Sequence, residues 1–101
     1  MNRSVSGTLT AAGVDRPLVG LTVVAARVQD GALEPLGAAI TNALGAFRIG
    51  YPPEPRPVDL TVLVLDQTGG LLYREPVHRA ISGAELRIRV EVPRTALGEV
   101  H

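Results

Sequence analysis

The sequence predicts an all-β protein, a seven-stranded antiparallel β-sandwich, and three observations support this. Hydrophobic residues recur with a period of two over most of the 101 residues, as expected for strands with one buried face. Turn-forming residues interrupt the alternation about every dozen residues. No segment gives a convincing helical period, and short strands between frequent turns are typical of a sandwich.

The first two strands are separated by a loop rich in glycine and proline. Residues 4–10 form the first expected strand, because Val5 and Leu9 alternate with serine and threonine. Residues 11–20 contain two glycines and a proline, so we expect a loop there. Residues 21–28 are apolar enough for a second strand, with hydrophobic side chains at both odd and even positions.

The third and fourth strands follow a turn. Residues 29–34 are expected to turn, because Asp30 and Gly31 tolerate a positive φ. Short strands are then expected at 35–41 and 46–51.

A corner with the sequence TNALGAF joins those two strands. Thr41 and Asn42 are expected to end a strand with side chains that accept hydrogen bonds from turn amides. Gly45 allows a positive φ at no steric cost, and Phe47 is expected to enter the core. We therefore interpret this corner as a structural turn and not as a reactive site.

The second half of the chain supplies the remaining strands. Residues 52–57 contain four prolines and are expected to be an extended loop. Residues 58–66 and 71–78 are expected to be strands joined by a tight turn at 67–70. Residues 84–93 alternate almost perfectly, which predicts an antiparallel strand with one solvated face. Residues 1–93 thus form one predicted domain, and 94–101 a C-terminal tail.

Four short motifs along these strands resemble those of the carboxypeptidase regulatory-like domain, a transthyretin-like β-sandwich. The matching residues are Val5-Gly7-Leu9, Pro17-Leu18-Gly20, Thr41-Asn42-Gly45-Phe47 and Asp59-Leu60-Val62-Val64-Asp66-Gly69. The resemblance covers residues 5 to 92. It implies a non-catalytic accessory or interaction module, of the kind attached to enzymes, toxins and secretion or tail-spike proteins.

One position departs from the family pattern. Asn42 stands where the family usually has aspartate. Asparagine can fill the same role in a turn, because its side chain also caps local amides and tolerates the left-handed region. A calcium-binding carboxylate at the corner is therefore not expected.

Composition excludes several classes of function. Ten basic and ten acidic residues balance, which argues against nucleic acid or an anionic membrane as the main partner. No cysteine is present, and all ten basic residues are arginine, so thiolate metal clusters, Schiff bases and lysine-derived isopeptide bonds are excluded. The first residues lack a signal-peptide pattern. We expect cytoplasmic synthesis without membrane insertion, with export as part of a larger assembly an open alternative.

Catalytic interpretations lack the residues they need. Of the two histidines, His101 is terminal and His78 has only Ser82 as a nearby nucleophile. Some transthyretin-like hydrolases carry a C-terminal Tyr-Arg-Gly-Ser signature, whereas here the segment Tyr73–Pro76 is internal and lacks the glycine and serine. We therefore predict no enzymatic activity, no cofactor and no metal.

A ligand-binding role for the strand-end loops is the alternative. Loop oxygens can bind calcium, but the candidate aspartates are isolated in the sequence and are better explained as turn caps. A carbohydrate platform needs an exposed aromatic ring, and only Tyr51 and Tyr73 could supply one. The aspartates concerned are Asp15, Asp30, Asp59 and Asp66.

Two strands, 21–28 and 58–66, are apolar on both faces. A sandwich strand with a solvated outer face alternates apolar with polar residues, so something must cover these outer faces. The chain's own 52–57 loop is one candidate, and a second copy or another protein is the other. We expect a partner or self-association, with an interface formed by Val24, Ala26, Leu63 and Leu65. The predicted function is a non-catalytic interaction or assembly module, a small subunit or accessory of a larger toxin, tail-spike or secretion complex.

Overall fold

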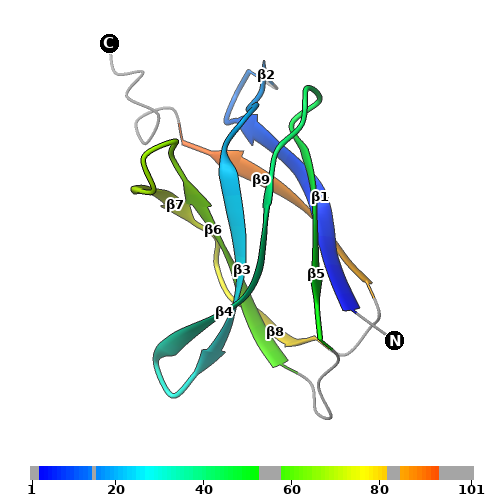
Figure 1. Ribbon diagram of the computed structural model, residues 1–101, viewed down its shortest axis with the longest axis vertical. Helices are drawn as coiled ribbons and strands as arrows, with labels where there is room; N and C mark the ends of the chain where they lie inside the picture. The colour runs from blue at the N-terminus through cyan, green and yellow to red at the C-terminus, as the bar shows by residue number, and fades with distance from the viewer. Residues whose placement is uncertain (1–2, 15, 53–57, 82–84, 94–101) are drawn as a thin grey trace.

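The computed structural model describes residues 3–14, 16–52, 58–81 and 85–93, which form strands and no helix (Figure 1). Two sheets face each other. Sheet A contains β2, β1, β5 and β9, and sheet B contains β4, β3, β6, β7 and β8. The strands are β1 Arg3–Ala11, β2 Arg16–Pro17, β3 Thr22–Gln29, β4 Ala32–Ile40, β5 Ala46–Tyr51, β6 Val58–Leu65, β7 Leu71–Arg74, β8 His78–Ile81 and β9 Glu85–Val92.

Strand β1 is the centre of sheet A. It pairs antiparallel with β5, where Val5 lies opposite Ile49, and antiparallel with the two-residue β2. It pairs with β9 in parallel, with Val5 opposite Leu86. The prediction that 84–93 is antiparallel is therefore wrong. The chain crosses from β8 in sheet B to β9 in sheet A, so no hairpin fixes its direction, and alternation is the same in both directions.

Strand β6 joins sheet B together. It pairs antiparallel with β3 on one side and with β7 and β8 on the other. The strand predicted at 71–78 is in fact two strands, since β7 ends at Arg74 and β8 begins at His78. Pro76 lies between them and has no N–H for a ladder hydrogen bond, which accounts for the break. With β2 added, the described residues form nine strands, not the predicted seven.

The β3–β4 hairpin is tighter than the sequence predicted. Only Asp30 and Gly31 form its turn, with φ of 53° and 78°. Positive φ at both central residues is the signature of a two-residue turn that matches the twist of the flanking strands. Strand β4 therefore begins at Ala32 and not at residue 35.

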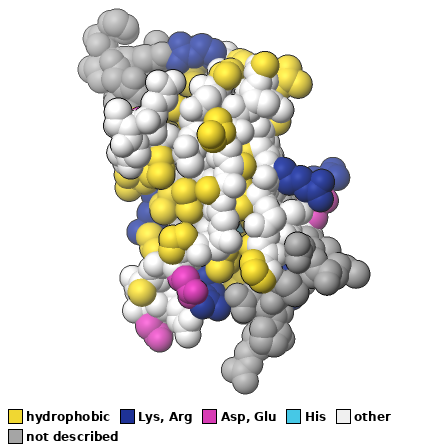
Figure 2. Space-filling model, viewed as in Figure 1, with side chains coloured by type: hydrophobic (Ala, Val, Ile, Leu, Met, Phe, Trp, Pro, Cys, Tyr) yellow, Lys and Arg dark blue, Asp and Glu magenta, His cyan; other side chains and the backbone are white. Residues whose placement is uncertain are grey.

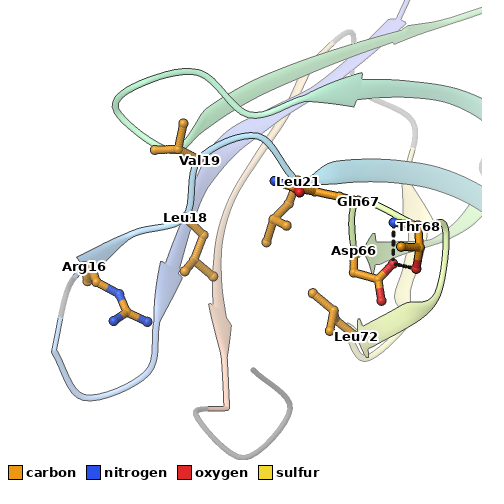
Figure 3. A pocket seen from close by; sticks show the side chains of 8 residues that line it. All are labelled: Arg16, Leu18, Val19, Leu21, Asp66, Gln67, Thr68 and Leu72. Atoms are coloured by element: carbon orange, nitrogen blue, oxygen red, sulfur yellow. Dashed lines mark hydrogen bonds between the residues drawn. The ribbon is translucent and has the colours of Figure 1, made fainter. Parts of the chain in front are cut away.

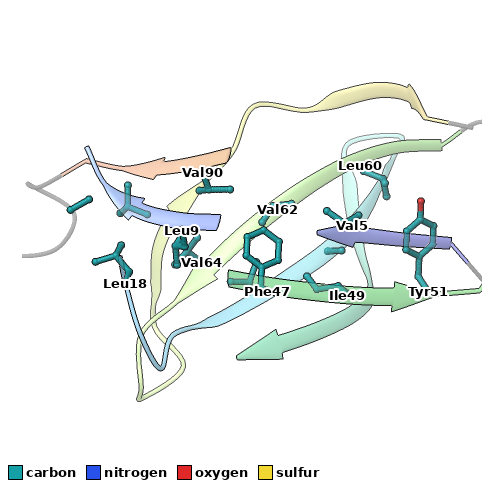
Figure 4. Packing of buried hydrophobic residues seen from close by; sticks show 14 of the residues in the cluster. Val5, Leu9, Leu18, Phe47, Ile49, Tyr51, Leu60, Val62, Val64 and Val90 are labelled. Carbon is teal, nitrogen blue, oxygen red and sulfur yellow. The ribbon is translucent and has the colours of Figure 1, made fainter. Parts of the chain in front are cut away.

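The core lies between the sheets and takes one side chain in two from each central strand (Figure 4). Sheet A contributes Phe47, the only phenylalanine, which is 5% exposed and points toward the strands of sheet B. Because no disulfide is present, this apolar burial is the main source of stability. The buried cluster consists of Val5, Leu9, Ala11, Leu18, Val23, Ala25, Phe47, Ile49, Tyr51, Val58, Leu60, Val62, Val64, Val90 and Val92.

Strand β4 of sheet B passes close to β5 of sheet A. A Cβ atom added at Gly37 would lie 2.6 Å from the carbonyl oxygen of Gly50, so only glycine allows this approach. Residues 53–57 of the predicted proline-rich loop and the predicted tail at 94–101 lie outside the described residues. Within the described part of the chain, no helix has the length and apolarity that a membrane crossing requires.

Candidate interaction surface

The corner after β4 is held by its own polar groups. Thr41 is 3% exposed, and its Oγ1 accepts a hydrogen bond of 3.1 Å from the Leu21 amide. Its backbone N–H donates to the Leu21 carbonyl at 3.0 Å, and its carbonyl accepts from the Gly20 amide at 3.1 Å. Thr41 therefore ties the corner to the loop that precedes β3.

Asn42 closes the turn itself. Its Oδ1 accepts hydrogen bonds from the amides of Leu44, at 2.9 Å, and Ala46, at 3.0 Å. Gly45 has a φ of 72°, and its carbonyl accepts a 2.8 Å hydrogen bond from the Leu9 amide in β1. Phe47 follows, pointing into the core. These side-chain and backbone groups are occupied by the turn, which gives them a structural role.

We predict that Asn42→Ala lowers the free energy of unfolding by about 1–2 kcal/mol, because two turn amides lose their acceptor. Asn42→Asp keeps the acceptor oxygen, and its expected change is within about 0.5 kcal/mol. Urea unfolding followed by circular dichroism measures both. Equal losses in the two variants would show that the acceptor oxygen is not what stabilises the corner.

The two sheets differ in the chemistry of their outer faces. On sheet A the outward positions of β9 are Glu85, Arg87, Arg89 and Glu91, all exposed. The Glu85 carboxylate accepts hydrogen bonds from Ser6 Oγ at 2.9 Å and Arg87 Nε at 3.1 Å, which holds its pKa below the usual range. This face is charged and hydrated.

The outer face of sheet B is mostly apolar toward the β6–β7 turn. Residues paired directly across neighbouring strands share a face, so the register defines two rows that cross four strands from β7 to β4. The first row is Arg74, Leu63, Val24 and Ala38, and the second is Leu71, Leu65, Thr22 and Ile40. Figure 2 shows hydrophobic side chains gathered over β6 and β7.

The predicted interface residues all lie on sheet B, but they differ in exposure. Val24, Leu63 and Leu65 are half-buried and belong to the two rows. Ala26 is fully buried, so its prediction as a contact residue is wrong. It pairs with Thr61, also fully buried, whose hydroxyl donates a 2.7 Å hydrogen bond to the Glu75 carbonyl in the β7–β8 connection.

The sequence interpretation missed the two most exposed hydrophobic side chains of this face. Ile40 is 68% exposed and Leu71 is 61% exposed, and they stand at opposite ends of the second row. Both lie in segments that the sequence predicts to be strands, but the face that each occupies depends on strand register. The sequence pattern of each strand does not fix that register by itself.

A small titratable cluster lies where β7 passes into β8. Burial raises the pKa of the Glu75 carboxyl, and His78 and a hydrogen bond from the Tyr73 hydroxyl partly oppose that rise. His78 Nε2 lies 3.9 Å from Glu75 Oε2, and the Glu75 side chain is 13% exposed. His78 therefore faces an acidic neighbour at the sheet edge. Its sequence-proposed partner Ser82 lies outside the described residues.

The raised pKa of Glu75 predicts a pH dependence of stability. Between the ordinary glutamate pKa, about 4.3, and the raised folded-state value, the folded chain binds more protons, so stability falls as pH rises through that window. Glu75→Gln cannot ionise and still accepts the Tyr73 hydrogen bond. We expect it to raise the melting temperature at pH 7 but not at pH 4. An identical difference at both pH values would contradict this.

A hollow of about 470 Å³ opens at one end of the sandwich (Figure 3). Apolar side chains from the loop before β3 and from β7 form its walls, and Asp66 lies at its side. Asp66 Oδ1 accepts hydrogen bonds from Thr68 N, Thr68 Oγ1 and Gly70 N, which lower its pKa. The lining residues are Arg16, Leu18, Val19, Leu21, Asp66, Gln67, Thr68 and Leu72.

The predicted calcium candidates do not meet. Asp30 lies in the β3–β4 turn, Asp59 in β6 and Asp66 in the β6–β7 turn, while Asp15 lies outside the described residues. Among the residues that the structure describes, no three acidic or histidine side chains are close enough together to hold a metal ion.

Comparison with known proteins shows the fold and no more. No protein-family model and no curated protein sequence matches this chain. A 9R-lipoxygenase from Cyanothece is similar in structure with a TM-score of 0.67 and 17% identity, over 91% of this chain but only 16% of the lipoxygenase. An alternative pilotin from the type II secretion system of Vibrio cholerae is similar with a TM-score of 0.56 and 14% identity, over 92% of this chain and 96% of the pilotin.

Proposed function

We propose that this chain is a non-catalytic interaction module that binds protein through the outer face of sheet B. The observation that carries the proposal is the difference between the two outer faces. Sheet A presents charged side chains to water, whereas sheet B presents two rows in which Arg74 is the only charged residue. An exposed apolar face with little charge is typical of a surface that is covered in the working protein.

The outward leucines of β6 support binding of another molecule at the outer face of sheet B more than packing within one chain. Leu63 and Leu65 point away from the core, since Leu60, Val62 and Val64 on the same strand point into it. Replacing outward leucines with polar residues would cost an isolated sandwich little. Contact with another surface would give outward leucines at these positions a physical reason.

We further propose that the module is of the transthyretin-like type and serves as a small subunit or accessory of a larger assembly, such as a toxin, tail-spike or secretion complex. The four motifs from Val5 to Gly69 support the family. The pilotin supports a role in a larger assembly. It comes from a secretion system, and the structural match covers 96% of its chain.

The size of the native complex tests this function. In an extract of cells that produce the chain, we expect wild type to elute well above the 10.6 kDa of one chain, and Leu65→Arg to elute at single-chain size. Thr8→Arg places the same charge on an exposed position of sheet A and should elute as wild type. Circular dichroism of each purified variant checks folding.

Two results would refute the proposed function. One is elution of wild type as a single chain both in the extract and as purified protein at about 500 µM. The other is an equal loss of the complex in Thr8→Arg, because that would show an effect of added charge and not of the sheet B face. If Leu65→Arg fails to fold, Leu71→Arg replaces it, since Leu71 is already 61% exposed.

The hollow beside Asp66 favours a second candidate, a carbohydrate- or calcium-binding module that uses strand-end loops. Its volume of about 470 Å³ lies in the range of small-molecule sites. Thermal melting with excess calcium chloride, and separately with neutral oligosaccharides, tests it. A rise in melting temperature that is lost in Leu72→Arg would support this candidate, and unchanged melting would leave the protein-binding module.

A further inference from the structure

We propose that the partner on the outer face of sheet B is a second copy of this chain, related by a two-fold axis that runs along the strands. The proposal rests on the proposed function, because it takes the same face and names what covers it. In this pairing Leu71 of one copy packs on Ile40 of the other.

The ends of the second row need a cover that one chain cannot supply. Leu71 and Ile40 are the most exposed large hydrophobic side chains within the described strands. Leu65 and Thr22 lie between them in the row. Neighbouring strands are about 4.8 Å apart, so the two ends of a row across four strands are about 14 Å apart. They cannot contact each other within one copy.

Rotation about an axis along the strands brings these ends together. An axis between β3 and β6 lays the β7 end of each row over the β4 end of the same row in the second copy. Leu71 then covers Ile40, and Arg74 lies opposite Ala38 at the rim, where water can still reach its guanidinium. Packing of the two sheets with nearly aligned strands is a common arrangement of sheet faces.

The other simple symmetry is unfavourable. An axis across the strands would exchange the two rows and lay β7 over β7. Arg74 would then lie on Leu71 of the second copy, so a cation would lose water against an apolar side chain. Ile40 would meet only Ala38. The positions of the single charge and the two exposed hydrophobic ends therefore select the axis along the strands.

Charge also favours a second copy over a different protein. Interfaces that choose a different partner commonly use complementary charges for that choice. The two rows contain one charged residue, Arg74, and the proposed symmetry never places it against itself. The face can therefore pack against the same face of a second copy, as a two-fold contact requires.

The size of the face sets the expected strength. Strands β3, β4 and β6 have eight or nine residues each and β7 has four, so at a spacing of about 4.8 Å and a rise of about 3.3 Å per residue they cover on the order of 450 Å² per copy. The total of about 900 Å² is below the range of about 1,200–2,000 Å² for stable interfaces and is typical of a weak, transient contact. We therefore expect a dissociation constant on the order of 10 µM and a dimer that forms only as concentration rises.

Sedimentation equilibrium of the purified full chain, from about 1 to about 500 µM, tests the pairing. Wild type should shift from the mass of one chain to that of two. Ile40→Glu and Leu71→Arg should each raise the dissociation constant at least about tenfold. The variant with both changes should return to within about threefold of wild type, because the two introduced charges lie opposite each other across the axis. Thr8→Arg is the control without effect.

Cross-linking locates the axis independently. The chain has no cysteine, so a single introduced cysteine is the only thiol with which the cross-linker can react. When Leu71→Cys and Ile40→Cys chains of different tag length are mixed with a short bismaleimide, the mixed product should exceed both like-with-like products. Excess Leu71→Cys self-linking, or a double charge variant without recovery, overturns the proposed axis.

The two proposals fail in different ways. If purified wild type has the mass of one chain at every concentration, the self-pairing is overturned. The proposed function then still stands if Leu65→Arg removes a larger species from the extract. If a dimer forms but Leu65→Arg, Ile40→Glu and Leu71→Arg all leave it unchanged, the outer face of sheet B is not the interface, and both proposals fall.

Discussion

Gly7→Ala is expected to lower the free energy of unfolding by about 3 kcal/mol or more. Gly7 lies in β1 opposite Ile88 of the parallel strand β9. A Cβ atom there would be 1.9 Å from the Ile88 carbonyl oxygen and 2.9 Å from the carbonyl carbon. Both atoms belong to the backbone, so no side-chain rotation relieves the clash. Strand β9 would have to move, and the buried Val90 and Val92 would move with it.

Gly50→Ala is the matched control for this prediction. Gly50 lies in β5 of the same sheet, has no positive φ, and has open space where a Cβ would be. Alanine should leave stability unchanged or raise it by up to about 1 kcal/mol, because it restricts the unfolded chain. Urea unfolding of both variants is the measurement. Equal stability of Gly7→Ala and Gly50→Ala would contradict the close approach of β1 and β9.

The strands were predictable because each inner face is apolar, and because the alternation of apolar and polar residues can be read within a single segment of the sequence. In β5, Phe47, Ile49 and Tyr51 are buried, while Arg48 and Gly50 are exposed, as a period of two requires. Strand direction and partners were not predictable in the same way. The alternation of β9 would look the same in an antiparallel strand, and its partner β1 lies at the other end of the sequence.

The candidate surface was predictable in part for the same reason. Leu63 and Leu65 are visible as outward residues once the inward residues of their strand are assigned. The burial of Ala26 was not predictable, since the alternation of its own strand places it on the same side as the half-buried Val24. The row that joins Leu71 to Ile40 depends on the register of four strands, which the pattern of each strand alone does not contain.

Gly45→Val is expected to lower the free energy of unfolding by about 3 kcal/mol. Two effects combine. A φ of 72° is unfavourable for any residue with a Cβ and most unfavourable for a β-branched one. The added Cβ would also lie 2.6 Å from the Leu9 carbonyl oxygen and 3.2 Å from the Leu18 amide nitrogen.

Gly69→Val separates those two effects. Gly69 has a φ of 90° in the β6–β7 turn, and nothing lies within 4 Å of the position a Cβ would take. Gly69→Val should therefore lower the free energy of unfolding only through its unfavourable positive φ, by about 1–2 kcal/mol. The excess loss at Gly45 measures the clash with Leu9, whose amide and carbonyl join the corner to the loop before β3. Equal losses in urea unfolding would mean that the corner can move away from β1, and that the hydrogen bond from the Leu9 amide to the Gly45 carbonyl does not hold it in place.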